Sequence, residues 1–138
     1  MLERKFPSLA GTPYRVTSPA SREYNCIAYA ARDNTRFWWP HEQAYWPEGL
    51  PKEETIEAMV LAFESLGYER SNSVDREEGK EKVAIYADGD SPKHAARQLH
   101  SGLWTSKLGS SVDIAHTLEG LEGTEYGRAV CILERARP

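Results

Sequence analysis

The stretch KVAIYADGDSPKHAARQLHSGLWTS at positions 82–106 decides the fold of this chain. Its first part, 82–87, is a short apolar run that an Asp-Gly-Asp turn ends, which predicts a strand. Residues 94–99 have the composition of a short helix, but 100–102 are typical of a hairpin turn and 103–106 of a returning strand. We therefore expect a strand, a second strand and a hairpin return within this stretch.

Two helices are predicted on the N-terminal side of this stretch. Residues 22–31 consist mostly of small side chains and follow a segment rich in helix-breaking residues, which favours a helix. In 53–66, apolar side chains recur at helical spacing and Gly67 follows directly, so a second helix is expected there. The side chains that make this spacing are Ile56, Met59, Val60, Phe63 and Leu66.

The remaining segments complete the order of the elements. Residues 1–20 contain several prolines and predict an irregular N-terminal arm, and the polar segment 69–81 predicts a surface loop. A serine cap predicts a short helix over 112–121, and the apolar run within 127–135 predicts the last strand. Helices followed by a mostly antiparallel sheet indicate an α+β fold, in which N-terminal helices pack on the sheet.

The composition is that of an ordinary soluble protein. The chain has 138 residues, of which 40% are hydrophobic and 28% charged, so we expect a single domain over 1–138. Its net charge of −4 argues against nucleic-acid binding, and no apolar run is long enough to span a membrane. Residues 1–7 lack the apolar core of a signal peptide, so a cytoplasmic location is expected. Neither a metal nor another cofactor is expected, because metal-ligand pairs such as Cys-x-x-Cys are absent from the sequence.

Cys26 and His94 are the candidate nucleophile and general base. Cys26 stands near the start of a predicted helix, within YNCIAYAA at 24–31, where the helix dipole favours a thiolate. His94 lies in a polar, turn-like context, and a thiol beside an imidazole is the pair that covalent acyl transfer uses. Asn25 and the amide of Cys26 are candidates for an oxyanion hole. The alternative is that Cys26 is an ordinary buried cysteine and His94 an exposed surface residue.

A third polar residue should orient the histidine, and the candidates downstream are Ser106, Lys107, Asp113 and His116. An acid holds an imidazole most strongly, which favours Asp113. Asp113 is explained equally well as a charge at the start of a helix. The strand around Ser106 fits the expected chain order, in which the cysteine lies on a helix, the histidine on a later strand and the polar residue on the strand after it. These alternatives stay open. A metal site that combines the cysteine, the first histidine and His116 is the least favoured alternative.

The segment 37–47 is rich in aromatic residues and holds Trp38, Trp39 and Trp46. Its prolines exclude a regular helix, so we expect an extended aromatic wall for an extended peptide, a sugar or a protein partner. Lys107 and His116 are the other candidates for substrate binding. The alternative is that this segment covers one edge of the core.

Several stretches together resemble a family of small, uncharacterised bacterial proteins. They are YNCIAYA at 24–30, FWWP at 37–40, YWP at 45–47, KVAIY at 82–86, HAARQL at 94–99 and WTSKLG at 104–109. The resemblance covers the chain from about Tyr24 to Leu133 and implies a role for the candidate residues above. The chain order of Cys26, His94 and a later polar residue also resembles, more weakly, papain-like cysteine hydrolases. That resemblance implies a papain-like or transglutaminase-like core.

The favoured interpretation is therefore a cysteine hydrolase or acyltransferase that acts on an amide bond through Cys26 and His94. In that case Cys26 should react with iodoacetamide well below the pH expected for a free thiol. The alternative is a non-enzymatic protein-interaction module that uses the tryptophan-rich segment as its surface. In that case Cys26 should be buried and inert.

Overall fold

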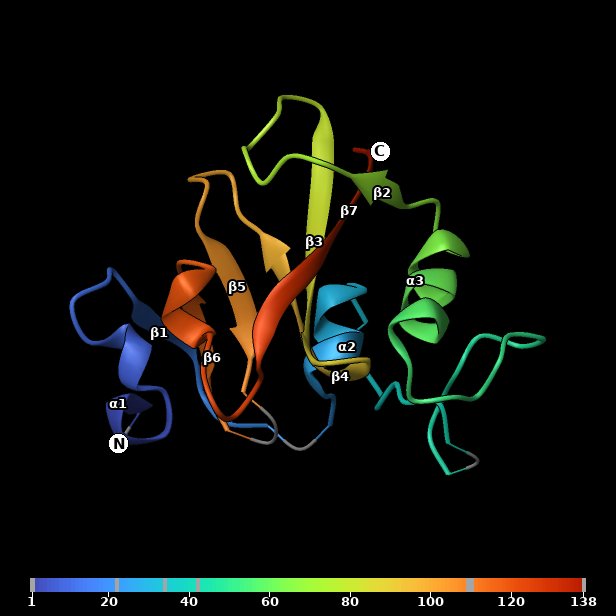
Figure 1. The fold of residues 1–138 in the computed structure, drawn as a ribbon, viewed down its shortest axis with the longest axis horizontal. Coiled ribbons are helices and arrows are strands. Elements are labelled where there is room, and N and C mark those ends of the chain that lie inside the picture. Colours follow the sequence, from blue (N-terminus) through green and yellow to red (C-terminus); the bar gives the residue numbers. More distant parts are fainter. Residues whose placement is uncertain (1, 22, 34, 42, 109–110, 138) are drawn as a thin grey trace.

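A seven-stranded antiparallel sheet dominates the fold (Figure 1), with the strand order β1-β6-β5-β4-β3-β7-β2. The computed structural model describes residues 2–21, 23–33, 35–41, 43–108 and 111–137. The strands are β1 Arg15–Ser18, β2 Glu69–Ser71, β3 Lys80–Asp88, β4 Ser91–Gln98, β5 Trp104–Lys107, β6 Asp113–His116 and β7 Arg128–Ala136. Every neighbouring pair of strands runs antiparallel.

The helices are short. They are α1 Leu2–Lys5, α2 Cys26–Ala30 and α3 Ile56–Glu64, together with the 3-10 turns η1 Pro7–Leu9 and η2 Glu119–Leu121. In the part of the chain that the structure describes, none of them has the length and the apolar character needed to cross a membrane.

The expected arrangement, N-terminal helices packed on a sheet with a papain-like or transglutaminase-like core, is wrong. The molecule is mostly sheet, because three segments predicted as arm, loop or helix supply strands instead: β1, β2 and β6. These strands have only three or four residues each, too few for a periodic pattern to show in the sequence. They form by pairing with strands that are distant in the chain, such as β1 with β6 and β2 with β7.

The decisive stretch 82–106 folds as the hairpin interpretation predicts. Strands β3 and β4 pair from Val83 opposite Arg97 to Asp88 opposite Ser91, and β5 then pairs with β4. Helix α3 confirms the helix predicted over 53–66, with Thr55 capping it by accepting a hydrogen bond from the amide of Ala58. The predicted helix over 112–121 is wrong, since its first half forms β6 and its second half forms η2.

The two faces of the sheet carry separate apolar cores. The face toward α2 and α3, the α2 face, includes Val83, Ile85, Ala95 and Leu133. The opposite face, the arm face, is covered by Phe6 and Leu9 of the N-terminal arm and by Leu121 of η2; its sheet residues include Ala84, Tyr86, Ala96 and Trp104. Because both faces are covered, β3 is buried along almost its whole length rather than in alternation.

Gly127 lies directly before β7, beside the end of β3, which pairs with β7. Its backbone φ is +75°, and a Cβ atom added there would lie 2.1 Å from the carbonyl oxygen of Ala87. Only glycine fits here, because any side chain would collide with backbone that cannot move aside. Gly79 has a similar φ of +79° but has open space around it.

Candidate functional site

Cys26 opens helix α2, and its thiol faces backbone amides. Asn25 caps the helix: its side chain accepts a hydrogen bond from the amide of Ala28 at 3.2 Å. The amides of Ala95, Ile27 and Cys26 itself favour the thiolate, but burial outweighs them and raises the pKa of Cys26 to about 11. The lowered thiol pKa expected from the helix dipole is therefore not found. At neutral pH the group is a protonated thiol.

His94 lies in β4 and is completely buried. Its ring stacks on the ring of Tyr126 with the centroids 4.0 Å apart and meets the ring of Tyr86 edge-on at 5.5 Å. Neither ring nitrogen has a hydrogen-bond partner among the residues that the structure describes. Burial, with a smaller contribution from His116, lowers the pKa of His94 well below 6.5, so the imidazole is neutral. His94 is thus not the exposed surface residue of the alternative interpretation.

The structure brings Cys26 and His94 to the same part of β4 without joining them. The thiol lies against Ala95 on the α2 face, whereas His94 packs on the tyrosines of the arm face. Successive side chains of a strand point to opposite faces, which explains why no hydrogen bond links the ring and the thiol. Tyr126 stacks on His94, and burial raises its pKa, with a smaller contribution from the charge of Cys26 when that thiol is ionised.

Tyr126 is a further residue beside His94, and the sequence did not indicate it. It lies in the irregular segment before β7, within TEYG at 124–127, where no periodicity or motif marks it. Only the return of this segment across the sheet places its ring against His94.

Ser106 and His116 form a buried hydrogen-bonded pair. The Oγ of Ser106 and the Nε2 of His116 are 2.6 Å apart, and the Nδ1 of His116 donates to the carbonyl of Thr117 at 2.6 Å. Since Nδ1 carries the proton, the Ser106 hydroxyl donates to Nε2. Burial lowers the pKa of His116 to about 4. His116 is close enough to His94 to lower its pKa, but neither Ser106 nor His116 hydrogen-bonds to the His94 ring.

Asp113 and Lys107 lie together and apart from His94. The Oδ2 of Asp113 accepts a hydrogen bond from Tyr24 at 3.0 Å, and its Oδ1 lies 4.0 Å from the Nζ of Lys107. Lys107 also donates to the carbonyl of Ser111 and is fully buried, so burial lowers its pKa. Asp113 therefore ties the segment before Cys26 to β6 and makes no hydrogen bond to either imidazole.

The tryptophan-rich segment is largely part of the core. Trp38 and Trp46 are buried with α2 and α3, and Trp39 is half-buried. The indole nitrogen of Trp38 donates to Asp33 at 2.9 Å, and that of Trp46 donates to the carbonyl of Pro51 at 2.9 Å. The structure thus places two of the three predicted wall residues where no substrate or partner contacts them.

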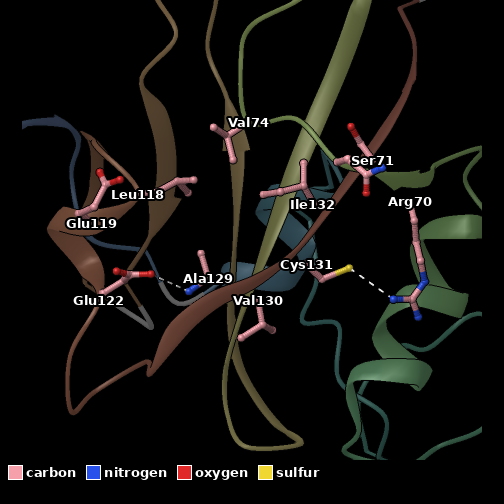
Figure 2. A pocket seen from close by; sticks show the side chains of 11 residues that line it. Arg70, Ser71, Val74, Leu118, Glu119, Glu122, Ala129, Val130, Cys131 and Ile132 are labelled. Atoms are coloured by element: carbon pink, nitrogen blue, oxygen red, sulfur yellow. Dashed lines mark hydrogen bonds between the residues drawn. The ribbon is translucent and has the colours of Figure 1, made fainter.

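A hollow of about 460 Å³ lies away from Cys26 and His94, between β7, β2 and η2 (Figure 2). In Figure 2 the thiol of Cys131 points toward the Arg70 guanidinium, 3.9 Å away, and Glu122 accepts a hydrogen bond from the amide of Ala129. Burial raises the pKa of Cys131. The hollow holds no imidazole beside this thiol, so it lacks the base of a nucleophile-base pair.

A metal site is not assembled either. Within the described ranges, no three His, Cys, Asp or Glu side chains lie close enough together to hold a metal ion. This includes Cys26, His94 and His116, the set weighed from the sequence.

The family model of a domain of unknown function, DUF7689, matches residues 15–134. Comparisons with curated proteins and with solved structures gave no match. The match confirms the expected membership of an uncharacterised family, whereas the resemblance to papain-like hydrolases gains no support. Because the matched span covers most of its length, the chain belongs to the DUF7689 family.

Proposed function

We propose that this protein is a thiol-dependent acyl-transfer enzyme that acts on an amide bond of a peptide or protein, with Cys26 as nucleophile and His94 as general base. One observation carries the proposal. His94 is fully buried with both ring nitrogens unpartnered, directly beside Ala95, whose amide faces the Cys26 thiol.

An unpartnered imidazole in a protein core needs an explanation. Each buried polar atom without a hydrogen bond costs about 1–3 kcal/mol, so a purely structural position would favour an apolar side chain. Such groups persist where they serve chemistry. A second buried histidine of this sheet, His116, is fully hydrogen-bonded, whereas His94 is held by ring packing on Tyr126 and Tyr86 and by no hydrogen bond of its ring among the described residues.

The protonation states require the proton to move in the same step as the attack, because the raised thiol pKa and the lowered imidazole pKa disfavour a separate thiolate-imidazolium pair. At neutral pH Cys26 is a thiol and His94 is a neutral base. The thiol and the ring lie on opposite faces of β4, so the opening that admits substrate must also bring them together; His94 then accepts the thiol proton while the sulfur bonds to the amide carbon. The carbon–nitrogen bond then breaks, and His94 returns the proton to the departing nitrogen. Water or an amine releases the acyl group from the sulfur.

Substrate access requires a local opening. Cys26 is only 9% exposed, and the Tyr126 ring covers His94. Displacement of the segment around Tyr126 would expose the imidazole at the end of the sheet.

Acylation of Cys26 by a p-nitrophenyl ester of an N-acetylated amino acid tests the proposal. The modified residue is identified by peptide mass mapping over a range of pH. We expect Cys26 to acylate at pH 7 despite its raised thiol pKa, and His94→Gln to slow this about 100-fold, the contribution of a general base.

Two variants serve as controls. His100→Gln removes an exposed imidazole that lies outside β4, and Cys131→Ser removes the other thiol; neither should change the rate. Equal rates in the wild type and in a folded His94→Gln variant would contradict the proposal. So would acylation confined to Cys131.

A further inference from the structure

Guanidinium groups gather around a single carboxylate on the α2 face, near the C-terminal end of α2. Glu81, only 6% exposed, binds the Nε of Arg135 at 2.8 Å and lies 3.3 Å from Arg32. Arg97 is the third arginine of this group. Burial lowers its pKa, and repulsion from the nearby charge of Arg32 lowers it further. Positive charge is therefore in excess here, although the whole chain carries a net charge of −4.

Two of these arginines line a small cavity of about 180 Å³ together with Tyr29 and Asp33. The carboxylate of Asp33 is already occupied. Its Oδ1 accepts from the amide and hydroxyl of Thr35, and its Oδ2 accepts from the Arg36 guanidinium and the Trp38 indole. Asp33 therefore does not balance the charge of Arg97, whereas Arg32 shares the Glu81 carboxylate with Arg135.

Arg97 has no acidic partner among the residues that the structure describes. Its buried Nε has no hydrogen-bond partner, and the nearest stabilising group is the Tyr29 ring, whose centroid is 5.1 Å from the guanidinium carbon. A guanidinium with an unused buried donor is costly unless another group supplies the acceptor.

The backbone of Arg32 supports the same conclusion. Its φ is +65°, and it is the one residue other than glycine with a positive φ in the described chain. This position follows the end of α2, where glycine is the usual residue. A strained backbone of this kind persists where the side chain is required, and here the side chain supplies the second guanidinium of the cavity.

We propose that the cavity between Arg32 and Arg97 binds an oxyanion group, a carboxylate or a phosphate. The planar guanidinium fork matches both groups, and two forks around a small hollow fit one such group. The site itself does not depend on the chemistry of Cys26.

The position of the cavity also specifies the proposed substrate. Arg97 follows Ala95 by two residues on β4, so it lies on the same face and about 7 Å farther along the strand. Ala95 is the residue whose amide faces the thiol. This second step rests on the proposed function: the amide that Cys26 attacks would belong to a molecule with an anionic group about two residues away.

Calorimetric titration of the full-length Cys26→Ala variant tests the site without any turnover. Inorganic phosphate and N-acetylglycine are titrated separately at constant ionic strength, because exposed charges are screened by salt. We expect saturable binding of at least one anion and a loss of at least tenfold in affinity when Arg97→Gln is added. The matched control is Arg70→Gln, which removes an exposed guanidinium already paired with Glu57 and should leave the affinity unchanged.

The Nε–H resonance of Arg97 gives a second readout, since the bound anion should shift it. Binding of phosphate alone or of N-acetylglycine alone supports the site and identifies the group. Absence of saturable binding, or equal affinity with and without Arg97→Gln, would overturn it. If the anion binds but Cys26 of the wild type does not acylate, the anion site is retained and the proposed function is wrong. If Cys26 acylates but no anion binds, the proposed function is retained and the anion site is wrong.

Discussion

At the scale of the residue, the two buried imidazoles should make stability depend on pH. His94 and His116 have folded-state pKa values below the ordinary value of 6.5, His116 at about 4. The unfolded chain therefore binds more protons than the folded chain between pH 6.5 and 4. Stability from these groups is present above pH 6.5 and is lost as the pH falls through this window.

For His116 alone we expect a loss of about 3 kcal/mol in the free energy of unfolding between pH 7 and pH 4. Urea denaturation at a series of pH values measures it. His116→Gln should be less stable at pH 7, because it alters the pair with Ser106, but its stability should fall less steeply with acid. An unchanged slope in this variant would show that His116 is not the neutral, buried group described above.

The same scale shows how far the sequence predicts the site. The sequence identified Cys26 and His94 by residue type and chain position. His94 belongs to β4, and Cys26 lies against the amide of the next residue of that strand, Ala95. The sequence could not give the register of that strand, which decides that Ala95, not His94, faces the thiol. Nor could it weigh the helix dipole against burial, because the burial of Cys26 depends on packing against β4 and β5.

At the scale of the element, α2 depends on its cap. The helix has only five residues, too few for its own hydrogen bonds to hold it. The Asn25 side chain accepts hydrogen bonds from the amides of Ala28 and Trp38, at 3.2 and 3.0 Å, and donates to the carbonyl of Trp38 at 2.8 Å. It thus joins the start of the helix to the aromatic segment, which is a structural explanation for a residue predicted to serve an oxyanion hole.

We expect Asn25→Ala to lower the free energy of unfolding by about 2–3 kcal/mol, from the lost cap and the lost contacts with Trp38. Asn25→Asp keeps the acceptor and loses the donor, so its cost should be smaller, about 1 kcal/mol. Urea titration followed by tryptophan fluorescence compares the three proteins. An Asn25→Asp variant as unstable as Asn25→Ala would show that the donated bond, not the cap, dominates.

Elements with a long local pattern were predictable, and elements defined by their partners were not. Helix α3 shows apolar side chains at helical spacing, and β3 and β4 flank a glycine turn, so both signals are local. In 112–116 the signal was misread as a helix start. The segment forms a strand that is enclosed between β1 and β5 and buried on both faces. Its polar residues Asp113 and His116 lie on opposite faces, so the sequence does not show the alternation of apolar and polar residues that marks a strand.

At the scale of the whole molecule, protection should decrease from the middle of the sheet to its edges. β3 and β4 have a strand on each side and a core on each face, whereas β2 has three residues and lies at one edge. We expect the amides of β2 to exchange with solvent at least about 100-fold faster than those of β3, because local opening suffices to expose them. Hydrogen exchange followed by mass spectrometry measures both strands in one experiment. Equal protection of β2 and β3 would mean that the sheet opens only as a unit.

Gly127 shows how a loop position can be as constrained as a core position. The pairing of β7 with β3 leaves 2.1 Å between a hypothetical Cβ and the Ala87 carbonyl, so the restriction comes from the close approach of two backbones and not from burial. Over evolutionary time, substitutions should be eliminated at this codon while Gly79, in an equally left-handed but open turn, tolerates asparagine. A glycine retained at this place, just before the last strand, would thus be a sequence marker of this close approach in related chains.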